Sequence, residues 1–286
     1  MKRILSVHRA PEKHWVGDGF PVRTVLHSKM DGASPFLLLD YAEPIRFEPS
    51  DKPRGVEEHP HRGFETVTIV FQGELEHRDS AGNHGKIGPG DVQWMTAASG
   101  VVHEEKHGTE FTRNGGTFEV AQLWVNLPAA HKISPPAYQE LKNENIPVVE
   151  MPGGGSARVI AGDFNGTMGP ARTVIPVFLW DVSVRAGSRL DLPDPSGSSA
   201  IVFIRSGSVR LNDTEEAGAL ELAVFAVDGE GVAVEALEDS KLLVLGGEPI
   251  DEPVVAHGPF VMNTFEEIRQ AVADYQNGVM GTLAAR

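Results

Sequence analysis

The sequence contains no cysteine among its 286 residues. This excludes disulfide bonds, thiolate-bound zinc, iron–sulfur clusters and thiol nucleophiles. Long apolar runs are also missing: the longest, Val174 to Trp180, is interrupted by Pro176 and is far shorter than the ~18 residues that a membrane span needs. The apolar stretch from Ile4 to Val7 is too short for a secretory signal. We therefore expect a soluble, cytoplasmic protein that binds no membrane.

Positive charge is scarce, since 25 lysines and arginines stand against 40 aspartates and glutamates, giving a net charge of −15. A polyanion would be repelled by such a surface, so we expect no direct binding to nucleic acid. The hydrophobic fraction of 41% is sufficient for a real core. The length allows one or two domains.

Glycine and proline are abundant, with 31 and 20 residues respectively, and they separate short segments rich in Val, Ile, Thr and Phe. This pattern is typical of an all-β sandwich or barrel. The segment Ala200 to Arg205 followed by Ser206-Gly207 resembles Thr66 to Phe71 followed by Gln72-Gly73. The second half of the chain therefore repeats the character of the first. The strands expected most clearly are 21–27, 36–40, 66–71, 75–78, 92–95, 118–127, 177–184, 200–205, 208–211, 219–227 and 241–245.

A polar, proline-rich segment that ends in Gly153-Gly154-Gly155-Ser156 indicates a linker over residues 132–156. It would separate a first domain, 1–131, from a second, 157–286. The second domain would end in a helix, because Thr264 and Glu267 form a capping box and apolar residues follow at helical spacing. Such a helix is expected to cover a sheet.

Histidine is concentrated in the first half of the chain, and His59-Pro60-His61 is its sharpest feature. Residues i and i+2 of a strand point to one face, so both imidazoles would project together. Pro60 confines this stretch to a strand start or an edge. His103 and Glu105 repeat the same spacing. Two such pairs on neighbouring strands would offer three nitrogens and one oxygen to a first-row divalent metal.

The carboxylate of this set has a rival, because Glu65 follows His61 by four residues and could complete the site instead. Direction favours Glu105 over Glu104, which would point to the other face of an extended segment. The ligand set accepts Fe, Mn, Ni, Cu, Co or Zn. The remaining histidines of this half that lie in or near loops are expected to be solvated or hydrogen-bonded: His77, His84, His107 and His131.

Longer motifs surround these residues. The chain reads HPHRGFETVT at 59–68, GKIGPGDVQWMTA at 85–97, GVVHEE at 100–105, QLWVNL at 122–127, YQEL at 138–141 and GPFVMNT at 258–264. With these motifs the sequence resembles the pirin family of the cupin superfamily, over most of its length. The resemblance implies two tandem cupin domains, each a double-stranded β-helix or jelly-roll barrel.

The resemblance also implies one metal ion in the N-terminal barrel, usually iron, which we expect as Fe(II). The family's ligand positions correspond to His59, His61, His103 and Glu105 here. The C-terminal barrel is expected to be metal-free. The similar strand-and-turn segments of the two halves are 134 residues apart. At that offset His59 corresponds to Pro193 and Glu65 to Ser199, and neither of these residues is a suitable metal ligand.

Two functions follow from the resemblance. The first is a quercetin 2,3-dioxygenase-like oxidoreductase, which opens the ring of a flavonol with O2 and releases CO; Glu105 would be its catalytic base. The second is a non-enzymatic, iron-binding and redox-sensitive module that acts through a protein partner in transcription. We favour the enzyme, with a small aromatic substrate and O2. Arg62 or Gln122 could orient the substrate, and the pocket would be lined by Phe64, Val67, Trp94, Met95, Gln122 and Trp124.

Overall fold

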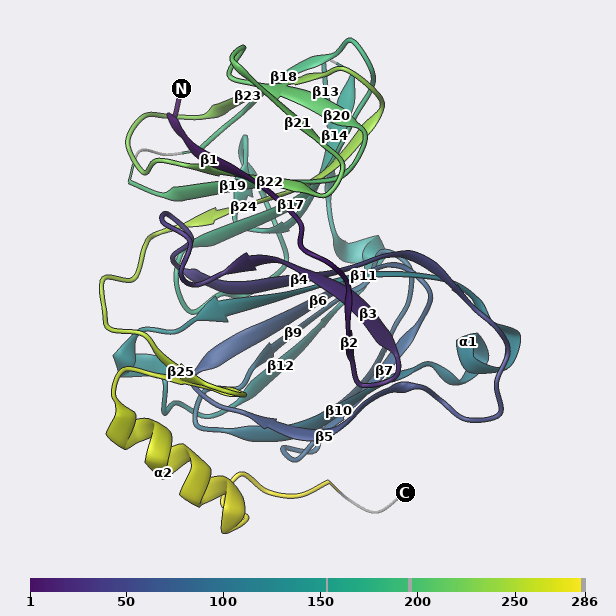
Figure 1. Ribbon diagram of the computed structural model, residues 1–286, viewed down its shortest axis with the longest axis vertical. Coiled ribbons are helices and arrows are strands. Elements are labelled where there is room, and N and C mark those ends of the chain that lie inside the picture. The colour runs from purple at the N-terminus through teal and green to yellow at the C-terminus, as the bar shows by residue number, and fades with distance from the viewer. Residues whose placement is uncertain (153, 195–196, 284–286) are drawn as a thin grey trace. The chain divides into compact units, whose positions relative to one another are not determined.

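The computed structural model describes residues 1–152, 154–194 and 197–283 (Figure 1). Antiparallel strands dominate it, as expected, and its α-helices are α1 (Thr109–Asn114) and α2 (Phe265–Gln276). Within the described chain, neither helix has the length and apolarity to cross a membrane. The residues cluster into two compact units. We call Glu12–Arg23, Leu38–Asn143 and Ile250–Arg286 the N-terminal barrel, and Met1–Pro11, Thr24–Leu37 and Glu144–Pro249 the C-terminal barrel.

The N-terminal barrel is a sandwich of two antiparallel sheets. Two strands of its larger sheet, β3 (Phe20–His27) and β4 (Phe36–Phe47), also include residues assigned to the other unit. Phenylalanines of the larger sheet, among them Phe20, Phe47 and Phe118, pack on Leu75 and Ile87 of the smaller one. The larger sheet has the order β12 (Ala137–Leu141), β9 (Val92–Thr96), β6 (Phe64–Gln72), β11 (Gly116–Asn126), β4 (Phe36–Phe47), β3 (Phe20–His27), β2 (His14–Val16). The smaller sheet has the order β5 (Gly55–His61), β10 (Val101–His107), β7 (Leu75–Asp79), β8 (His84–Ile87).

The C-terminal barrel repeats this arrangement, which confirms the predicted two-cupin fold. Trp180 and Phe225 of its larger sheet share one core with Leu192 and Val209 of its smaller sheet. The larger sheet has the order β1 (Ile4–Arg9), β22 (Glu221–Phe225), β19 (Ser199–Ser206), β24 (Ser240–Gly247), β17 (Val177–Val184), β14 (Gly155–Ala161), β13 (Val148–Met151). The smaller has the order β18 (Arg189–Leu192), β23 (Val232–Ala236), β20 (Ser208–Leu211), β21 (Glu215–Gly218).

Short elements complete the described chain. Two small hairpins join β15 (Asp163–Phe164) to β16 (Thr167–Met168) and β25 (Val255–His257) to β26 (Phe260–Met262). Two 3₁₀ turns cover Ala129–His131 and Asn143–Asn145. Residues 132–156, predicted as a linker, contain strands β12 and β13 at the edges of two different sheets. The compact units are discontinuous along the chain, so the boundaries 1–131, 132–156 and 157–286 stay a prediction.

Helix α2 begins at the predicted capping box. The Glu267 amide donates to Thr264 Oγ1 at 3.2 Å, and the Thr264 amide donates to Glu267 Oε2 at 2.8 Å. Its buried face, Ile268 and Ala271, packs on Val102 of β10 and on strand β26. The helix therefore covers a sheet of the N-terminal barrel, which confirms that it packs against a sheet. In Figure 1 it lies beside β25.

Candidate metal centre

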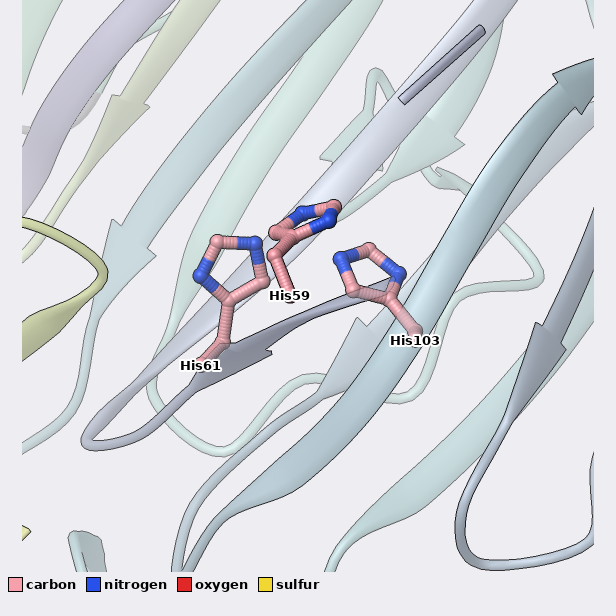
Figure 2. A group of neighbouring side chains, drawn as sticks. All are labelled: His59, His61 and His103. Carbon is pink, nitrogen blue, oxygen red and sulfur yellow. The ribbon is translucent and has the colours of Figure 1, made fainter. Parts of the chain in front are cut away.

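Strands β5 and β10 bring three histidines together in the N-terminal barrel. The two strands pair so that His103 stands directly opposite His59, and β5 is the edge of its sheet, as Pro60 predicted. His61 follows on the same face of β5. Figure 2 shows the three imidazole rings grouped, two from β5 and one from β10. The ring centroids of His59 and His103 are 4.3 Å apart, and that of His61 lies 4.8 Å from each.

The distances between the ring nitrogens, and the nitrogens left without a hydrogen bond, are both suitable for binding a metal ion. One nitrogen from each of His59, His61 and His103 lies within 4.8 Å of the others. Nδ1 of His59 is hydrogen-bonded to the carbonyl oxygen of Glu57 at 2.7 Å, and Nδ1 of His61 to that of Pro259 at 3.4 Å. This leaves Nε2 of both rings for a ligand, the usual arrangement around a bound metal.

His103 gives the clearest test of the fit. Its Nε2 is fully buried and has no hydrogen-bond partner among the described residues. An unpaired buried ring nitrogen is costly unless a ligand occupies it. Burial, together with the neighbouring His59, lowers the pKa of both His61 and His103 well below the usual value. Both rings are therefore neutral at physiological pH, which is the form that binds metals.

Glu105 is not in the group of His59, His61 and His103; its carboxylate belongs to a second group with His77 and His103, whose ligand atoms lie within 4.8 Å of one another. Three donors hold its carboxylate. Oε1 accepts from Thr68 Oγ1 at 3.1 Å and from Gln93 Nε2 at 3.2 Å, while Oε2 accepts from Gln122 Nε2 at 2.7 Å. The donors come from β6, β9 and β11, where they are register neighbours. The larger sheet thus fixes the position of a carboxylate that the smaller sheet supplies.

Neither rival carboxylate lies in a group of potential metal ligands with the histidines of the described residues, although Oε2 of Glu65 is buried without a hydrogen-bond partner there. Glu65 is fully buried; its Oε1 accepts from Thr96 Oγ1 at 2.6 Å, and burial raises its pKa. It belongs to neither group of potential metal ligands among the described residues. Glu104 accepts from Arg78 Nε at 2.5 Å. The direction of the strand therefore leaves Glu105 as the carboxylate beside the histidines.

Sequence reasoning missed His77 as part of this centre. Its Nε2 lies 3.2 Å from Asp79 Oδ2, and its Nδ1 lies 3.4 Å from Nδ1 of His103. The ring stacks on Tyr138, with centroids 4.9 Å apart. The i, i+2 spacing of His77 and Asp79 was an available signal, although the strand predicted from the sequence ended at residue 78, one residue before Asp79. It identified no partner, because the pairing of β7 with β10 is not encoded locally.

Strand direction divides the predicted pocket residues. Four of them share the face of the larger sheet that carries Thr68: Phe64, Met95, Gln122 and Trp124. Phe64 and Trp124 pack near the metal ligands, with ring centroids 5.0 Å and 5.2 Å from that of His61. Val67 and Trp94 are register partners of each other on the opposite face. Of the aromatic residues predicted for the pocket, Phe64 and Trp124 therefore line the site, and we call this pair its aromatic wall.

The two candidates for orienting a substrate have structural partners. Arg62 is 6% exposed; its Nε donates to the carbonyl oxygen of Ser99 at 2.6 Å and its Nη1 to Asp274 Oδ2 at 2.7 Å. It braces the end of β5 next to His61. Gln122 donates to Glu105, as described above, and so positions the carboxylate.

Two jelly-roll barrels, one with a histidine cluster inside it, define a two-domain cupin protein. The family model described as "Pirin" matches residues 19–125, and the model described as "Pirin C-terminal cupin domain" matches residues 179–281. The chain belongs to the pirin family.

Full-length relatives share this architecture. The chain is 50% identical to "Putative quercetin 2,3-dioxygenase PA2418" of Pseudomonas aeruginosa, over 97% of this chain and 98% of that protein. It is 38% identical to mouse pirin, over 92% of this chain and 89% of that protein. A crystal structure of quercetin 2,3-dioxygenase from Acinetobacter baumannii superposes with a TM-score of 0.96 at 44% sequence identity. The match covers 99% of this chain and 100% of that chain.

Proposed function

We propose that this protein is a metal-dependent dioxygenase that opens the ring of a flavonol such as quercetin with O2 and releases CO. The observation that carries the proposal is the group of three histidines, with a carboxylate held by three donors next to one of them, His103. The relatives named for this activity, at 50% and 44% identity over nearly the whole chain, support it.

The metal ligands we propose are His59, His61, His103 and Glu105, and the proposed ion is Fe(II). When bound, such an ion would supply Lewis acidity that lowers the pKa of a hydroxyl group on the substrate, together with access to oxygen chemistry. The same donors suit other divalent first-row metals. A solved structure of bacterial pirin YhhW from Escherichia coli was obtained in complex with nickel(II).

Glu105 is the proposed base that accepts the hydroxyl proton of the flavonol. Thr68, Gln93 and Gln122 all donate to its carboxylate, so they hold it at a fixed angle beside His103. Fixing a base before the substrate arrives removes the cost of orienting it during the reaction. The donor from β11, Gln122 Nε2, lies 2.7 Å from Oε2 and is the shortest of the three hydrogen bonds.

The aromatic wall formed by Phe64 and Trp124 is the proposed contact surface for the planar rings of the substrate. The two ring centroids lie 4.3 Å apart, so together they present a continuous apolar surface. Apolar walls around a few convergent polar groups are the usual composition of a small-molecule site. They also exclude water from the reacting atoms.

The decisive experiment measures quercetin-dependent oxygen uptake and CO release by the Fe(II)-loaded protein, with metal content determined on the same sample. We expect one metal ion per chain and uptake in step with quercetin loss. His61→Ala should lose metal and turnover together. His84→Ala, which alters an exposed histidine at the start of β8, should keep both. An absence of turnover at full metal occupancy would contradict the proposal and would favour a redox-sensitive binding module.

A further inference from the structure

A chain of polar contacts leads from His103 to the turn that follows β7. Nδ1 of His103 lies 3.4 Å from Nδ1 of His77, and Nε2 of His77 lies 3.2 Å from Asp79 Oδ2. The three side chains come from the adjacent strands β7 and β10, and all three are buried. The protein itself therefore determines which ring nitrogen carries each proton, because the partner of one nitrogen sets the state of the other.

Asp79 can only accept hydrogen bonds. Its Oδ1 accepts from the backbone amides of Ala81 and Asn83 at 3.0 and 2.9 Å, and its Oδ2 accepts from Asn83 Nδ2 at 2.9 Å. Hydrogen bonds from N–H groups to an ionised carboxylate are among the strongest in proteins, and an ionised carboxylate has no proton to donate. The contact with His77 is therefore a hydrogen bond that Nε2 of the ring donates to Asp79.

Nδ1 of His77 is in turn an acceptor. A neutral imidazole with its proton on Nε2 has only a lone pair on Nδ1. Gln93 gives independent evidence, because its Nε2 lies 3.3 Å from this Nδ1. The orientation of that amide is fixed, since its Nε2 also donates to Glu105 at 3.2 Å and its Oε1 accepts from the Tyr138 hydroxyl at 3.2 Å. A second N–H on the His77 ring would point at the donor group of Gln93, so the ring is neutral.

These roles determine the tautomer of His103. Its Nδ1 faces the lone pair on Nδ1 of His77, so the hydrogen bond between the rings needs the proton on Nδ1 of His103. Nε2 of His103 then has the lone pair, and this is the buried atom that has no hydrogen-bond partner in the described chain. The opposite tautomer would bring two lone pairs together between the rings and would place a proton where the proposed metal would bind.

Packing holds the His77 ring in place for this role. The phenol ring of Tyr138 stacks on it, with centroids 4.9 Å apart and planes inclined by 17°. Gly85 is the register partner of His77 on β8, and a Cβ atom at this position would collide with the Tyr138 hydroxyl. The absence of a side chain at Gly85 thus gives room to the tyrosine that orients both the imidazole and Gln93.

We propose that His77 is a positioning residue that fixes the tautomer of His103, and that the Asp79 carboxylate fixes the tautomer of His77 in turn. The chain of hydrogen bonds runs in one direction, from His103 to His77 to Asp79, and leaves Nε2 of His103 ready for a metal. Groups that orient a ligating histidine in this way normally change metal affinity by about 10–100-fold when they are replaced. The proposal rests on the metal ligands proposed above, but not on the flavonol as substrate.

The positions of the protons can be measured directly. Nitrogen-15 NMR of the full-length protein, labelled at histidine and stripped of metal, distinguishes ring nitrogens that carry a proton from those that carry a lone pair. At pH 7 we expect the proton of His103 on Nδ1 and that of His77 on Nε2. A proton on Nε2 of His103 would overturn the proposal. This readout involves neither metal nor quercetin, so it does not depend on the proposed activity.

Asp79→Asn should reverse the chain of hydrogen bonds without a change of shape. The backbone amides of Ala81 and Asn83 still need an acceptor, so the oxygen of the substituted side chain stays beside them and its NH2 group faces His77. His77 must then accept on Nε2 and carry its proton on Nδ1, which forces His103 into the wrong tautomer. We expect Ni(II), titrated by calorimetry, to bind about 10–100-fold more weakly to this variant.

Asp91→Asn is the matched control. The Asp91 carboxylate also accepts from two backbone amides, those of Gly88 and Asn143 at 3.0 and 2.8 Å, in the turn before β9. We expect the affinity for Ni(II) and the histidine tautomers of this variant to equal those of the wild type. Unchanged affinity in Asp79→Asn, or an equal loss in both variants, would overturn the proposal.

Two replacements of His77 separate positioning from packing. His77→Asn keeps an acceptor close to the place of the ring Nδ1, so it should bind Ni(II) within about threefold of the wild type. His77→Leu removes the acceptor and should lose about 10–100-fold; equal losses in the two variants would overturn the proposal. If circular dichroism shows that His77→Leu does not fold, Asp79→Asn decides. A wild type that binds no Ni(II) would contradict the proposed metal centre instead, and the NMR result would still decide this proposal.

Discussion

Arg62 and Asp274 are 212 residues apart in the chain and are joined by an ion pair, with Nη1 and Oδ2 at 2.7 Å. Arg62 follows the metal-ligand candidate His61 directly, and Asp274 lies on α2. The guanidinium lowers the pKa of the Asp274 carboxyl, with help from Gln270. Helix α2 therefore supports the strand end that carries His61.

Replacing Asp274 by alanine should loosen this strand end. The buried guanidinium of Arg62 would lose its carboxylate partner, at a cost of about 1–3 kcal/mol of folding stability. We expect a weaker metal affinity as well, because His61 loses its brace. Chemical denaturation and metal titration of Asp274→Ala measure both effects. Arg269→Ala on the same helix, which breaks an exposed pair with Glu266, should change neither; equal effects in the two variants would refute the role.

The two carboxylates near the site should respond differently to loss of charge. Glu105→Gln should lower turnover by about 10²–10⁴-fold, the usual contribution of a general base, and should weaken metal binding. Glu65→Gln should leave metal content within about twofold, because burial already raises the pKa of Glu65 and an amide can still accept from Thr96. Metal analysis and oxygen uptake test this pair. The reverse ranking would show that Glu65 is the ligand.

His107 predicts a pH dependence of stability that is unrelated to the metal. Its ring lies among the phenylalanines of the N-terminal barrel, 4.6 Å from Phe47 and 4.7 Å from Phe118, and its Nε2 donates to the carbonyl oxygen of Gly19 at 3.0 Å. Burial lowers the pKa of His107 to about 4. Between its unfolded pKa and pH 4, the unfolded chain therefore binds a proton that the folded chain does not.

Folding stability should fall as the pH drops through this window. By linkage, His107 alone should cost about 3 kcal/mol at pH 4 relative to pH 8. His107→Phe should flatten the profile by that amount between pH 6.5 and pH 4, measured by urea denaturation at several pH values. His84→Phe provides the exposed control. Parallel profiles for wild type and His107→Phe would contradict the prediction.

Lys132 is a buried lysine whose replacement should destabilise the N-terminal barrel. Its Nζ donates to the carbonyl oxygens of Gly63 and Val261 and to Asn126 Oδ1, at 2.7, 3.0 and 2.7 Å. Lys132→Met keeps the length of the side chain but removes the donor from three acceptors, at a cost of roughly 2–4 kcal/mol. Thermal unfolding measures it. Lys29→Met, at an exposed position, should shift the melting temperature little; a similar shift in both would contradict this role.

Local geometry explains what the sequence could predict. The spacing of His59 and His61 places two side chains on one face of any strand, whatever lies beside it. The capping box at Thr264 and Glu267 is likewise closed within four residues, and it appears as expected. The similar patterns of strands and turns in the two halves of the sequence were also sufficient to predict two barrels. These features need no knowledge of distant partners.

Pairing between distant segments explains what the sequence could not predict. Thr68, Gln93 and Gln122 meet around Glu105 only because β6, β9 and β11 are adjacent in one register. A shift of one residue would turn all three to the opposite face. For the same reason Val67 and Trp94 looked as suitable for the pocket as Phe64 and Trp124. The partner of Arg62 comes from a helix near the other end of the chain.

The order of strands also dictates an order of events during synthesis. Ile4 of β1 pairs with Phe225 of β22. The first strand to be synthesised therefore cannot form this pair until more than 220 further residues have been added to the chain. His61 obtains the carbonyl of Pro259, and Arg62 obtains Asp274, later still. Contacts of such long range are slow to form. A nascent chain that has completed only the strands of the N-terminal barrel therefore carries its histidines without their support, and it should acquire metal efficiently only after release.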